Sequence, residues 1–325
     1  PTQIPEEERD YYLERRYPAF GNLVPRDVAS RAAKERCDQG FGVGDTGLAV
    51  YLDFEDAIKR LGRDVVSARY GNLFAMYEKI TGDNPYETPM RIFPAVHYTM
   101  GGLWVDYDLM TTIPGLYAIG ECNFSDHGAN RLGGNSLSDL LVFGKLAGEY
   151  ASNYCKENPK KESNKDEIIN IIRKNTDILN REEGANPYLV HQKIQKIMDD
   201  HVGIVREEKE LQEGINKLED IKAEIKNIKA HSASQYNPGW NLAIDLNNMI
   251  VICEAVARAA LQREESRGAH TRLDYPEERD EGLTFNSIIK KAEDGSMSTH
   301  QDERRKPPDK LSQIANAELE ELENA

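Results

Sequence analysis

The sequence contains 325 residues, of which 39% are hydrophobic and 30% are charged, so it has the composition of an ordinary globular protein with room for two or three domains. Its formal net charge of −15 argues against a nucleic-acid partner, because a strongly acidic surface repels phosphate groups at long range. The four cysteines lack the spacing of zinc or iron-sulfur ligands, and no apolar run approaches the ~20 residues that cross a bilayer, so we predict neither a metal site nor a spanning helix.

The chain opens on Pro1 without an initiator methionine or a signal peptide, and we therefore expect it to begin inside a longer protein. Asp27 can cap a helix over residues 28–36, because its carboxylate accepts hydrogen bonds from the amides of the first turn. Arg26 then lies at a helix entrance, on a turn that Pro25 fixes. Two interpretations of Arg26 stay open: a surface charge beside a cap, or a cation placed for function.

Residues 40–45 are rich in glycine, yet they precede a strand-like run over residues 48–54 and not a helix. Since a phosphate-binding loop should follow a strand and open a helix, we predict a simple turn. Helical spacing returns over residues 55–62 and 70–81, and turn residues starting at Thr81 end the second helix.

Short apolar runs over residues 92–96, 103–105 and 116–119, separated by turns that contain glycine, predict strands. From residue 137 onward, small and apolar residues recur at the spacing of one helix face. The small members of this face would allow the helix to pack closely on a sheet; they are Gly144, Ala147, Gly148 and Ala151.

After Lys156 the sequence predicts a bundle of helices. One apolar stripe advances by three and four residues, as on one face of a long helix; its members are Leu211, Ile215, Leu218, Ile221, Ile225 and Ile228. A more apolar helix over residues 241–264 should bury Leu242, Leu246, Met249, Ile250, Cys253 and Ala257. The tail from Glu281 is polar and charged, and we expect parts of it to be disordered.

Two features of the central region could bind a cofactor. Glu121 follows the apolar run 116–119, and a carboxylate at a strand end can accept hydrogen bonds from ribityl or ribose hydroxyl groups. Residues Asn135, Ser136 and Leu137 begin the long helix, whose free amides and partial positive charge favour an electron-rich group such as flavin N1 and O2. The alternatives are a surface glutamate and an ordinary cap by Asn135.

His97 and Arg131 could together hold a substrate carboxylate. The arginine offers a planar pair of donors and the histidine a directed donor, and the intervening strands could bring both to one end of a sheet. A structural role for His97 stays open, and His127 is a weaker candidate of the same kind.

Several long motifs, in the same order, closely resemble the flavoprotein subunit of succinate dehydrogenase and fumarate reductase. The resemblance extends from about residue 6 to residue 280, and L-aspartate oxidase shares much of the pattern. The motifs that carry it are residues 97–102, 120–121, 127–137 and 263–270.

The resemblance implies roles for individual residues. Arg26 matches the proton-transferring arginine of the family's capping domain, whereas His97 and Arg131 match its ligands for the substrate carboxylates. Glu121 matches a contact to the flavin ribityl chain, and Ser136 with Leu137 matches the contacts to the flavin ring. Arg26 and Arg131 are therefore the expected catalytic residues.

The resemblance also implies a fold. We expect an α/β protein that comprises the C-terminal part of a Rossmann-like FAD-binding domain, a partial α+β capping domain and a C-terminal helical bundle. The expected boundaries are 1–93 for the capping domain, 94–155 for the FAD-binding part, 156–280 for the helical domain and 281–325 for the tail. The family's glycine-rich nucleotide fingerprint and the histidine that carries covalent FAD fall upstream of this sequence.

The implied activity is interconversion of succinate and fumarate, with electrons passed to an iron-sulfur subunit and a membrane-anchor subunit at the inner face of the cell membrane. The loop between Cys122 and Asp126 is one residue shorter than in some relatives, and the tail matches no ending expected for the family. Two alternatives stay open: an enzyme like L-aspartate oxidase, or a noncatalytic fragment that serves only as a structural or interaction module.

Overall fold

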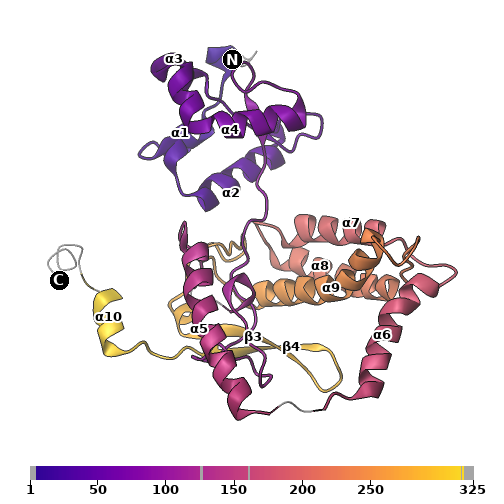
Figure 1. Cartoon of the computed structure of the whole chain (residues 1–325). Helices are drawn as coiled ribbons and strands as arrows, with labels where there is room; N and C mark the ends of the chain where they lie inside the picture. Colours follow the sequence, from indigo (N-terminus) through magenta and orange to yellow (C-terminus); the bar gives the residue numbers. More distant parts are fainter. Residues whose placement is uncertain (1–4, 125–126, 160–161, 316, 318–325) are drawn as a thin grey trace. The chain divides into compact units, whose positions relative to one another are not determined.

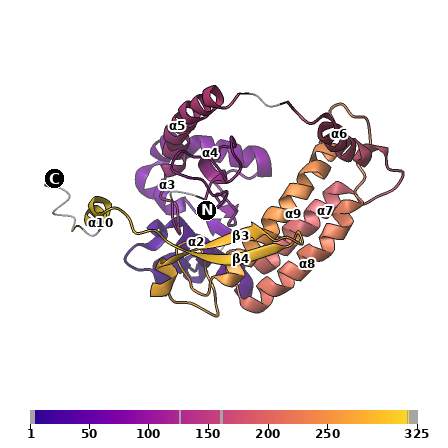
Figure 2. The same cartoon turned by 90° about the horizontal axis from the view of Figure 1, so that it is seen from below.

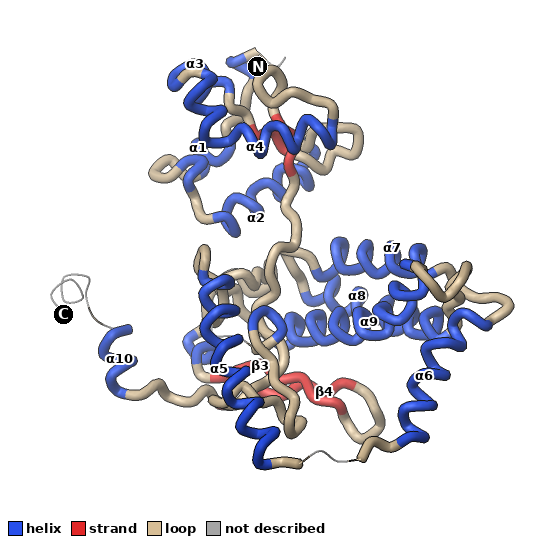
Figure 3. Tube along the Cα trace, in the orientation of Figure 1, coloured by secondary structure: helices blue, strands red, loops and turns tan. Residues whose placement is uncertain are grey.

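The computed structural model describes residues 5–124, 127–159, 162–315 and 317, and helices dominate these ranges (Figures 1 and 3). The chain divides into two compact units, residues 1–99 and 100–325. Within the described ranges, no helix is both long enough and apolar enough to cross a membrane.

Over its described residues, 5–99, the first unit combines four α-helices with a two-stranded antiparallel sheet in which Tyr51 pairs with Arg91. Its larger core gathers Val66, Phe74 and Met90, and the Phe74 ring meets the Tyr86 ring edge-on at 4.7 Å between centroids. The elements are α1 (Tyr12–Arg16), α2 (Arg26–Arg36), β1 (Val50–Leu52), α3 (Glu55–Leu61), α4 (Arg63–Thr81) and β2 (Met90–Ile92).

One prediction in this unit is wrong in its detail. Helix α2 begins at Arg26, and its N-cap residue is Pro25, with no side chain capping the first turn. Asp27 lies inside the helix and pairs instead with Arg31 one turn later, with 3.0 Å between Asp27 Oδ2 and Arg31 Nη2. The carboxylate thus has a cationic partner that a cap position would not offer.

The strand predicted over residues 92–96 is also wrong, because only Ile92 belongs to β2 and the residues after it are irregular. The remaining local predictions for this unit are confirmed. The glycine-rich stretch forms a turn in which Gly40 has φ 82°, and β1 follows it. Helix α4 ends at Gly82, whose φ of 80° is the left-handed conformation that glycine adopts at helix ends. The two predicted helices correspond to α3 and α4, and α4 begins earlier than predicted.

The second unit is built around a helical bundle: α6 (Lys165–Asn180), α7 (Pro187–Ile197), α8 (Glu208–Lys226) and α9 (Pro238–Gln262). In Figure 2, α7, α8 and α9 lie side by side. All six residues of the predicted stripe are at most 5% exposed, so the bundle prediction is confirmed. Asparagine side chains cap α7 and α9, because Asn186 and Asn237 accept hydrogen bonds from backbone amides of the first turns.

The stretch before α5 (Asn135–Glu157) contains less regular structure than predicted. The strands expected at 103–105 and 116–119 reduce to isolated bridges, Leu103 with Asn123 and Met110 with Tyr117. A strand exists only through hydrogen bonds to a neighbour, and among the described residues these runs meet no longer partner. The α/β assignment therefore holds in its coarse form, a helix-rich chain with short sheets.

The sequence did not predict the regular structure that follows residue 281. β3 (Phe285–Lys291) and β4 (Met297–Glu303) form an antiparallel hairpin, and α10 (Asp309–Ala315) follows. The hairpin turns at Gly295, where φ is 85° and the amide of Ala292 donates to the Ser296 carbonyl at 2.8 Å. Arg263 fixes its start by donating to the Phe285 carbonyl at 3.0 Å. Residues 318–325 of the predicted tail lie outside the described residues.

Candidate functional site

The start of α5 presents backbone donors that no side chain caps. Its N-cap is Gly134, in the left-handed conformation with φ 84°, and Asn135 is already helical. The interpretation of Asn135 as an ordinary cap is therefore wrong. Ser136 is half-buried and Leu137 is 66% exposed, so both first-turn residues are accessible from outside. The helix dipole makes this end attractive to electron-rich groups.

Glu121 lies beside this helix, although it does not close a strand as predicted. Residues Gly120–Cys122 form a single 3-10 turn after the extended Ile119. Gly120 has φ 68°, and a Cβ atom there would lie 2.3 Å from Cδ2 of Leu140 on α5. Only glycine allows this close approach, which holds the exposed Glu121 next to the first turns of α5.

Arg131 lies on a loop that a distant part of the chain supports. Its side chain is half-buried, and its Nη1 donates to the Leu132 carbonyl at 3.0 Å. The carbonyl of Ala129 accepts a hydrogen bond from the amide of Ala269 at 3.0 Å. At Gly268, where φ is 58°, a Cβ atom would lie 2.4 Å from that same carbonyl oxygen. The resemblance motif at 263–270 thus supports the loop that carries Arg131.

His127, the weaker candidate, belongs to a buried pair. Its Nε2 lies 3.7 Å from Oδ2 of Asp139 in the second turn of α5, and both side chains are at most 6% exposed. Such a pair fixes the loop against the helix and orients the imidazole ring. We therefore interpret His127 as a residue that positions the loop, and Asp139 is a contributor that the sequence did not reveal.

A buried carboxylate organises the supporting motif. Glu265 is 2% exposed and accepts hydrogen bonds from Arg263, from Arg267 Nε at 3.1 Å and from the Arg279 amide at 3.1 Å. Burial alone would raise the pKa of Glu265, but these donors hold it below its usual range. Sequence reasoning marked this motif only through the resemblance, because its partners are far apart along the chain.

His270 is held neutral within the same motif. Its Nδ1 lies 2.7 Å from Arg206 Nη1, and its Nε2 lies 3.0 Å from the Arg263 carbonyl, so Nε2 carries the proton. Burial, reinforced by the surrounding arginines, lowers the pKa of His270 to about 4. Arg272, only 1% exposed, forms a bidentate pair with Asp274 at 2.7 and 2.8 Å. Arg272 is buried, whereas His270 is half-buried and Asp274 is exposed, and we interpret these groups as structural supports of the motif.

The remaining two candidates belong to the first unit. Arg26 is the first residue of α2 and is exposed. His97 is exposed in the irregular stretch that follows β2. The structure thus brings Glu121, Ser136 and Leu137 together with the Arg131 loop in the second unit, whereas Arg26 and His97 lie in the first unit.

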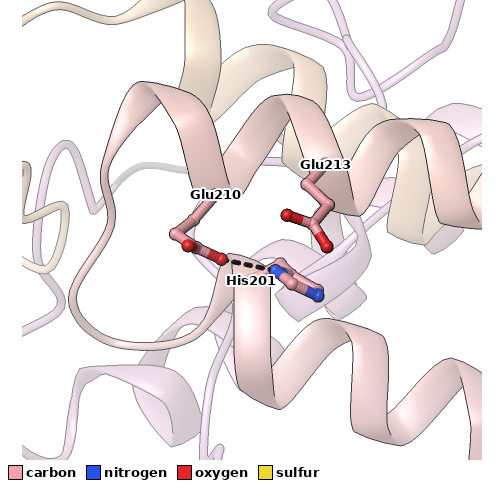
Figure 4. Close-up of side chains that lie close together, drawn as sticks. All are labelled: His201, Glu210 and Glu213. Carbon is pink, nitrogen blue, oxygen red and sulfur yellow. Dashed lines mark hydrogen bonds and ion pairs between the residues drawn. The ribbon is translucent and has the colours of Figure 1, made fainter.

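A second cluster of polar side chains lies in the bundle. His201 Nδ1 lies 2.6 Å from Glu210 Oε2, and Glu213 lies beside them (Figure 4). These three residues have donor atoms within 4.8 Å of one another, as metal ligands would. However, Lys217 Nζ lies 2.7 Å from His201 Nε2 and 2.8 Å from Glu213 Oε1. The lysine ammonium already contacts two of the three groups and offsets part of their negative charge, so we interpret the cluster as an ion network on the bundle.

The residues at the start of α5 fit a flavin. The uncapped helix end offers donors to the ring, and Glu121 offers a carboxylate to the sugar-like chain. Nothing lies within 4 Å of the position that a Cβ atom of Gly134 would occupy, so the approach to the helix is open. A planar anionic group is what this arrangement can accept.

Two family models match the chain. One, described as the fumarate reductase flavoprotein C-terminal region, matches residues 191–311, and one described as an FAD-binding domain matches residues 12–137. The first match reaches beyond α9 and through the hairpin, so the expectation that the tail matches no ending of the family is wrong for residues 281–311.

Curated relatives agree with these models. The succinate dehydrogenase flavoprotein subunit of Bacillus subtilis is 38% identical over 281 residues, which are 83% of this chain and 47% of that protein. The fumarate reductase flavoprotein subunit of Haemophilus influenzae is 33% identical over 267 residues, 80% of this chain and 44% of that protein. The chain thus spans about half the length of the curated relatives it matches.

Solved structures share the fold. Mycobacterium smegmatis Sdh1 in complex with UQ1 superposes with a TM-score of 0.81 at 35% identity, over 98% of this chain and 52% of that one. A quinol-fumarate reductase with menaquinol molecules gives a TM-score of 0.82 at 26% identity, over 94% and 55% of the two chains.

Proposed function

The chain belongs to the family of succinate dehydrogenase and fumarate reductase flavoprotein subunits, and from this premise we propose that it forms part of an FAD-containing enzyme that interconverts succinate and fumarate. The observation that carries the proposal is the uncapped start of α5, which the Arg131 loop directly precedes and which the turn that carries Glu121 contacts. Its relatives are oxidoreductases that act on this pair of dicarboxylates.

The proposed roles at the cofactor follow from the groups that are present. Glu121 would accept hydrogen bonds from the ribityl hydroxyls of FAD. Ser136 and Leu137 would lie against the electron-rich edge of the ring, where the Ser136 amide and the helix dipole would stabilise negative charge; the Leu137 amide donates to the Gly134 carbonyl at 3.1 Å. When bound, FAD supplies the acceptor or donor of a hydride at its N5 atom. We expect the histidine for covalent attachment of FAD outside this sequence.

His97 and Arg131 would hold the carboxylates of the substrate. The guanidinium of Arg131 can bind a carboxylate through two parallel hydrogen bonds, and the tether between Ala129 and Ala269 restrains its loop. A loop restrained in this way loses less conformational freedom when it binds the substrate. His97 would supply a directed second donor.

Arg26 would carry the proton at the carbon next to the hydride-transfer position. A guanidinium releases a proton at neutral pH only at a cost of about 7 kcal/mol, so an arginine can serve only in a relay that returns the proton at once. Arg26 is suited to such a relay by its exposed position at the very start of α2, where the backbone is fixed by Pro25.

The finer organisation is also part of the proposal. Residues 1–93 would belong to a capping domain, 94–155 to the end of a Rossmann-like FAD-binding domain, 156–280 to the helical domain and 281–325 to the tail. Electrons would pass to an iron-sulfur subunit, and a membrane-anchor subunit would hold the complex at the inner face of the cell membrane. Support comes from relatives whose structures contain UQ1 or menaquinol.

The test is a substitution of Arg26 in the purified flavin-containing protein. We expect Arg26→Gln to lower the rate of succinate oxidation with an artificial acceptor by about 10²–10⁴-fold, the usual loss on removing a proton-transfer group. Substrate binding should change little, since Arg26 is not one of the proposed carboxylate ligands. Steady-state kinetics, with kcat and KM determined separately, provide the measurement.

Arg31→Gln is the matched control, because Arg31 lies on the same helix and pairs with Asp27. It should retain turnover. Near-normal turnover of Arg26→Gln would exclude Arg26 as the proton carrier. A protein without flavin absorbance would favour a noncatalytic module, and oxidation of L-aspartate in place of succinate would favour the oxidase.

A further inference from the structure

A tight two-residue turn lies within the motif at 263–270. The Arg267 amide donates to the His270 carbonyl at 2.9 Å, and the His270 amide donates back to the Arg267 carbonyl at 3.0 Å. Gly268 and Ala269 therefore form the tip of the turn, and the φ of 58° at Gly268 suits a turn that has glycine at its first central position. We call residues 267–270 the supporting turn.

The tip of the supporting turn lies directly against the Arg131 loop. The Ala269 amide donates to the Ala129 carbonyl at 3.0 Å, and a Cβ atom at Gly268 would lie 2.4 Å from the same oxygen. Any side chain at position 268 would therefore push this carbonyl away. Since one residue separates Ala129 from Arg131, the supporting turn restrains the backbone from which the arginine side chain extends.

The side chain of Arg267 fixes the base of the supporting turn. Its Nε donates to Glu265 at 3.1 Å, its Nη1 to Glu278 at 2.9 Å and its Nη2 to the Arg279 carbonyl at 2.9 Å. The Arg267 side chain is 16% exposed and that of Glu265 is 2% exposed. A planar guanidinium whose three nitrogen atoms all have acceptors is held in one orientation. The position of the tip is thus set by charged contacts at the base.

A similar network in the bundle shows what a packing function looks like. Glu254 is also 2% exposed and accepts a hydrogen bond from Arg258 Nε at 2.8 Å, and Arg258 pairs with Glu219 as well. This network joins α8 to α9. Arg267 differs from Arg258 because the turn that it fixes ends in contact with the Arg131 loop. Comparing the two arginines therefore separates a contribution to stability from a contribution to the site.

We propose that Arg267 is a positioning residue for Arg131: it fixes the supporting turn, and the turn holds the Ala129–Arg131 segment in the conformation that binds a substrate carboxylate. The inference rests on the proposed function of Arg131 as a carboxylate ligand. A guanidinium that is already in place loses less conformational freedom on binding. Because Arg131 would contact the carboxylate both before and during the reaction, the restraint lowers KM and leaves kcat nearly unchanged.

Steady-state kinetics of the purified flavin-containing protein, with succinate and an artificial acceptor, test the effect on affinity. We expect Arg267→Gln to raise KM about tenfold and to change kcat by less than about twofold. The variant should fold, because Glu265 keeps its hydrogen bonds from Arg263 and from the Arg279 amide. Arg258→Gln is the matched control, since it removes a hydrogen bond to an equally buried glutamate. It should leave KM unchanged, even if it lowers stability.

Amide hydrogen exchange, followed by mass spectrometry, tests the positioning without any measurement of turnover. The hydrogen bond to Ala129 protects the Ala269 amide from exchange. In Arg267→Gln, peptides that contain Ala269 should exchange about tenfold faster than in the unchanged protein, because the tip is no longer fixed from its base. Peptides from α8 should exchange at the unchanged rate.

Gly268→Ala provides a second disruption, at the tip of the turn and not at its base. It displaces the Ala129 carbonyl while the Arg267 side chain keeps its three acceptors, so KM should rise in this variant too. A normal KM in both variants overturns the proposal, even if Ala269 exchanges faster. An equal rise of KM in Arg258→Gln also overturns it, because the effect would then follow from lost stability alone.

Failure of the proposed function would appear in a different place. If the unchanged protein does not oxidise succinate, the proposed function is wrong before any variant is compared. The exchange experiment still decides whether Arg267 fixes the supporting turn. Faster exchange in Arg267→Gln but not in Arg258→Gln supports the positioning of the Arg131 loop, whereas equal exchange in all three proteins overturns it.

Discussion

The helices α7, α8 and α9 and the stretch around α5 are both parts of the second unit, but they are stabilised in different ways. In the bundle, Leu211, Leu218 and Leu246 are completely buried, and each helix covers the apolar face of its neighbours. Around α5 the buried core is small, and Leu137 and Leu141 remain 66% and 77% exposed. The proposed site belongs to the second of these regions.

The difference shows how the site is positioned. Loops that carry Glu121 and Arg131 are fixed by single close contacts and not by a core. Examples are the approach of Gly120 to Leu140 and the hydrogen bond from Ala269 to Ala129. A rigid bundle supplies the motif at 263–270, which begins directly after α9 and reaches the Arg131 loop. Stability is thus concentrated in one region and ligand contacts in the other.

The largest difference in stability is expected when one leucine is shortened to alanine in each of the two regions. We expect Leu218→Ala, at a completely buried position of α8, to lower the free energy of unfolding by about 2–5 kcal/mol, because it leaves a cavity. Leu141→Ala on α5 should cost no more than about 0.5 kcal/mol, since that side chain is 77% exposed. Urea unfolding gives both values, and equal losses would contradict the comparison.

The sequence predicted more of the bundle than of the site, because the bundle depends on local signals. The stripe from Leu211 onward and the start of α5 at Asn135 were predicted, because helical periodicity and glycine punctuation are local signals. The buried pair of His127 with Asp139 and the arginines around Glu265 were not predicted. Their partners meet only after folding, and a single sequence contains no local signal for such contacts.

The strand predictions were less accurate, because a strand depends on the segment that pairs with it. The hairpin of β3 and β4 was missed, although its turn at Gly295 is local, because its outward-facing residues are polar and resemble a disordered tail. The runs at 103–105 and 116–119 have strand-like composition but form only isolated bridges in the described chain. Composition indicates that a segment can be a strand, whereas pairing decides whether it is one.

A smaller loss of stability should follow when a methyl group is added at Gly268, where the motif at 263–270 contacts the Arg131 loop. Gly268→Ala would place its Cβ atom 2.4 Å from the Ala129 carbonyl oxygen at a φ of 58°. We expect a loss of about 2–3 kcal/mol, because overpacking adds to the backbone strain. Gly295→Ala is the control: φ is 85°, but nothing lies within 4 Å, so about 1 kcal/mol is expected. If thermal unfolding shows equal losses of stability for the two variants, the Arg131 loop moves away from the added methyl group at no cost in free energy.

The smallest effect concerns His270 and depends on pH. Burial lowers the pKa of this residue to about 4, from the ordinary 6.5, so the unfolded chain takes up a proton at a pH where the folded chain does not. The contribution to stability is therefore complete above pH 6.5 and is lost as the pH falls toward 4. Between about pH 7 and about pH 4.5, the unchanged protein should lose about 2 kcal/mol more than His270→Gln does.

Urea unfolding at the two pH values measures this difference, and His300→Gln, on the exposed strand β4, is the matched control whose pH dependence should follow that of the unchanged protein. Parallel slopes for the unchanged protein and His270→Gln would mean that the imidazole takes up its proton as readily in the folded chain as in the unfolded one. Arg206 and the Arg263 carbonyl could not then hold the ring as described. A protonated Nδ1 has no lone pair, so it could not accept the hydrogen bond from the Arg206 guanidinium, which lies 2.7 Å away. A steeper slope for the unchanged protein therefore tests, through stability alone, the geometry of the motif that supports the Arg131 loop.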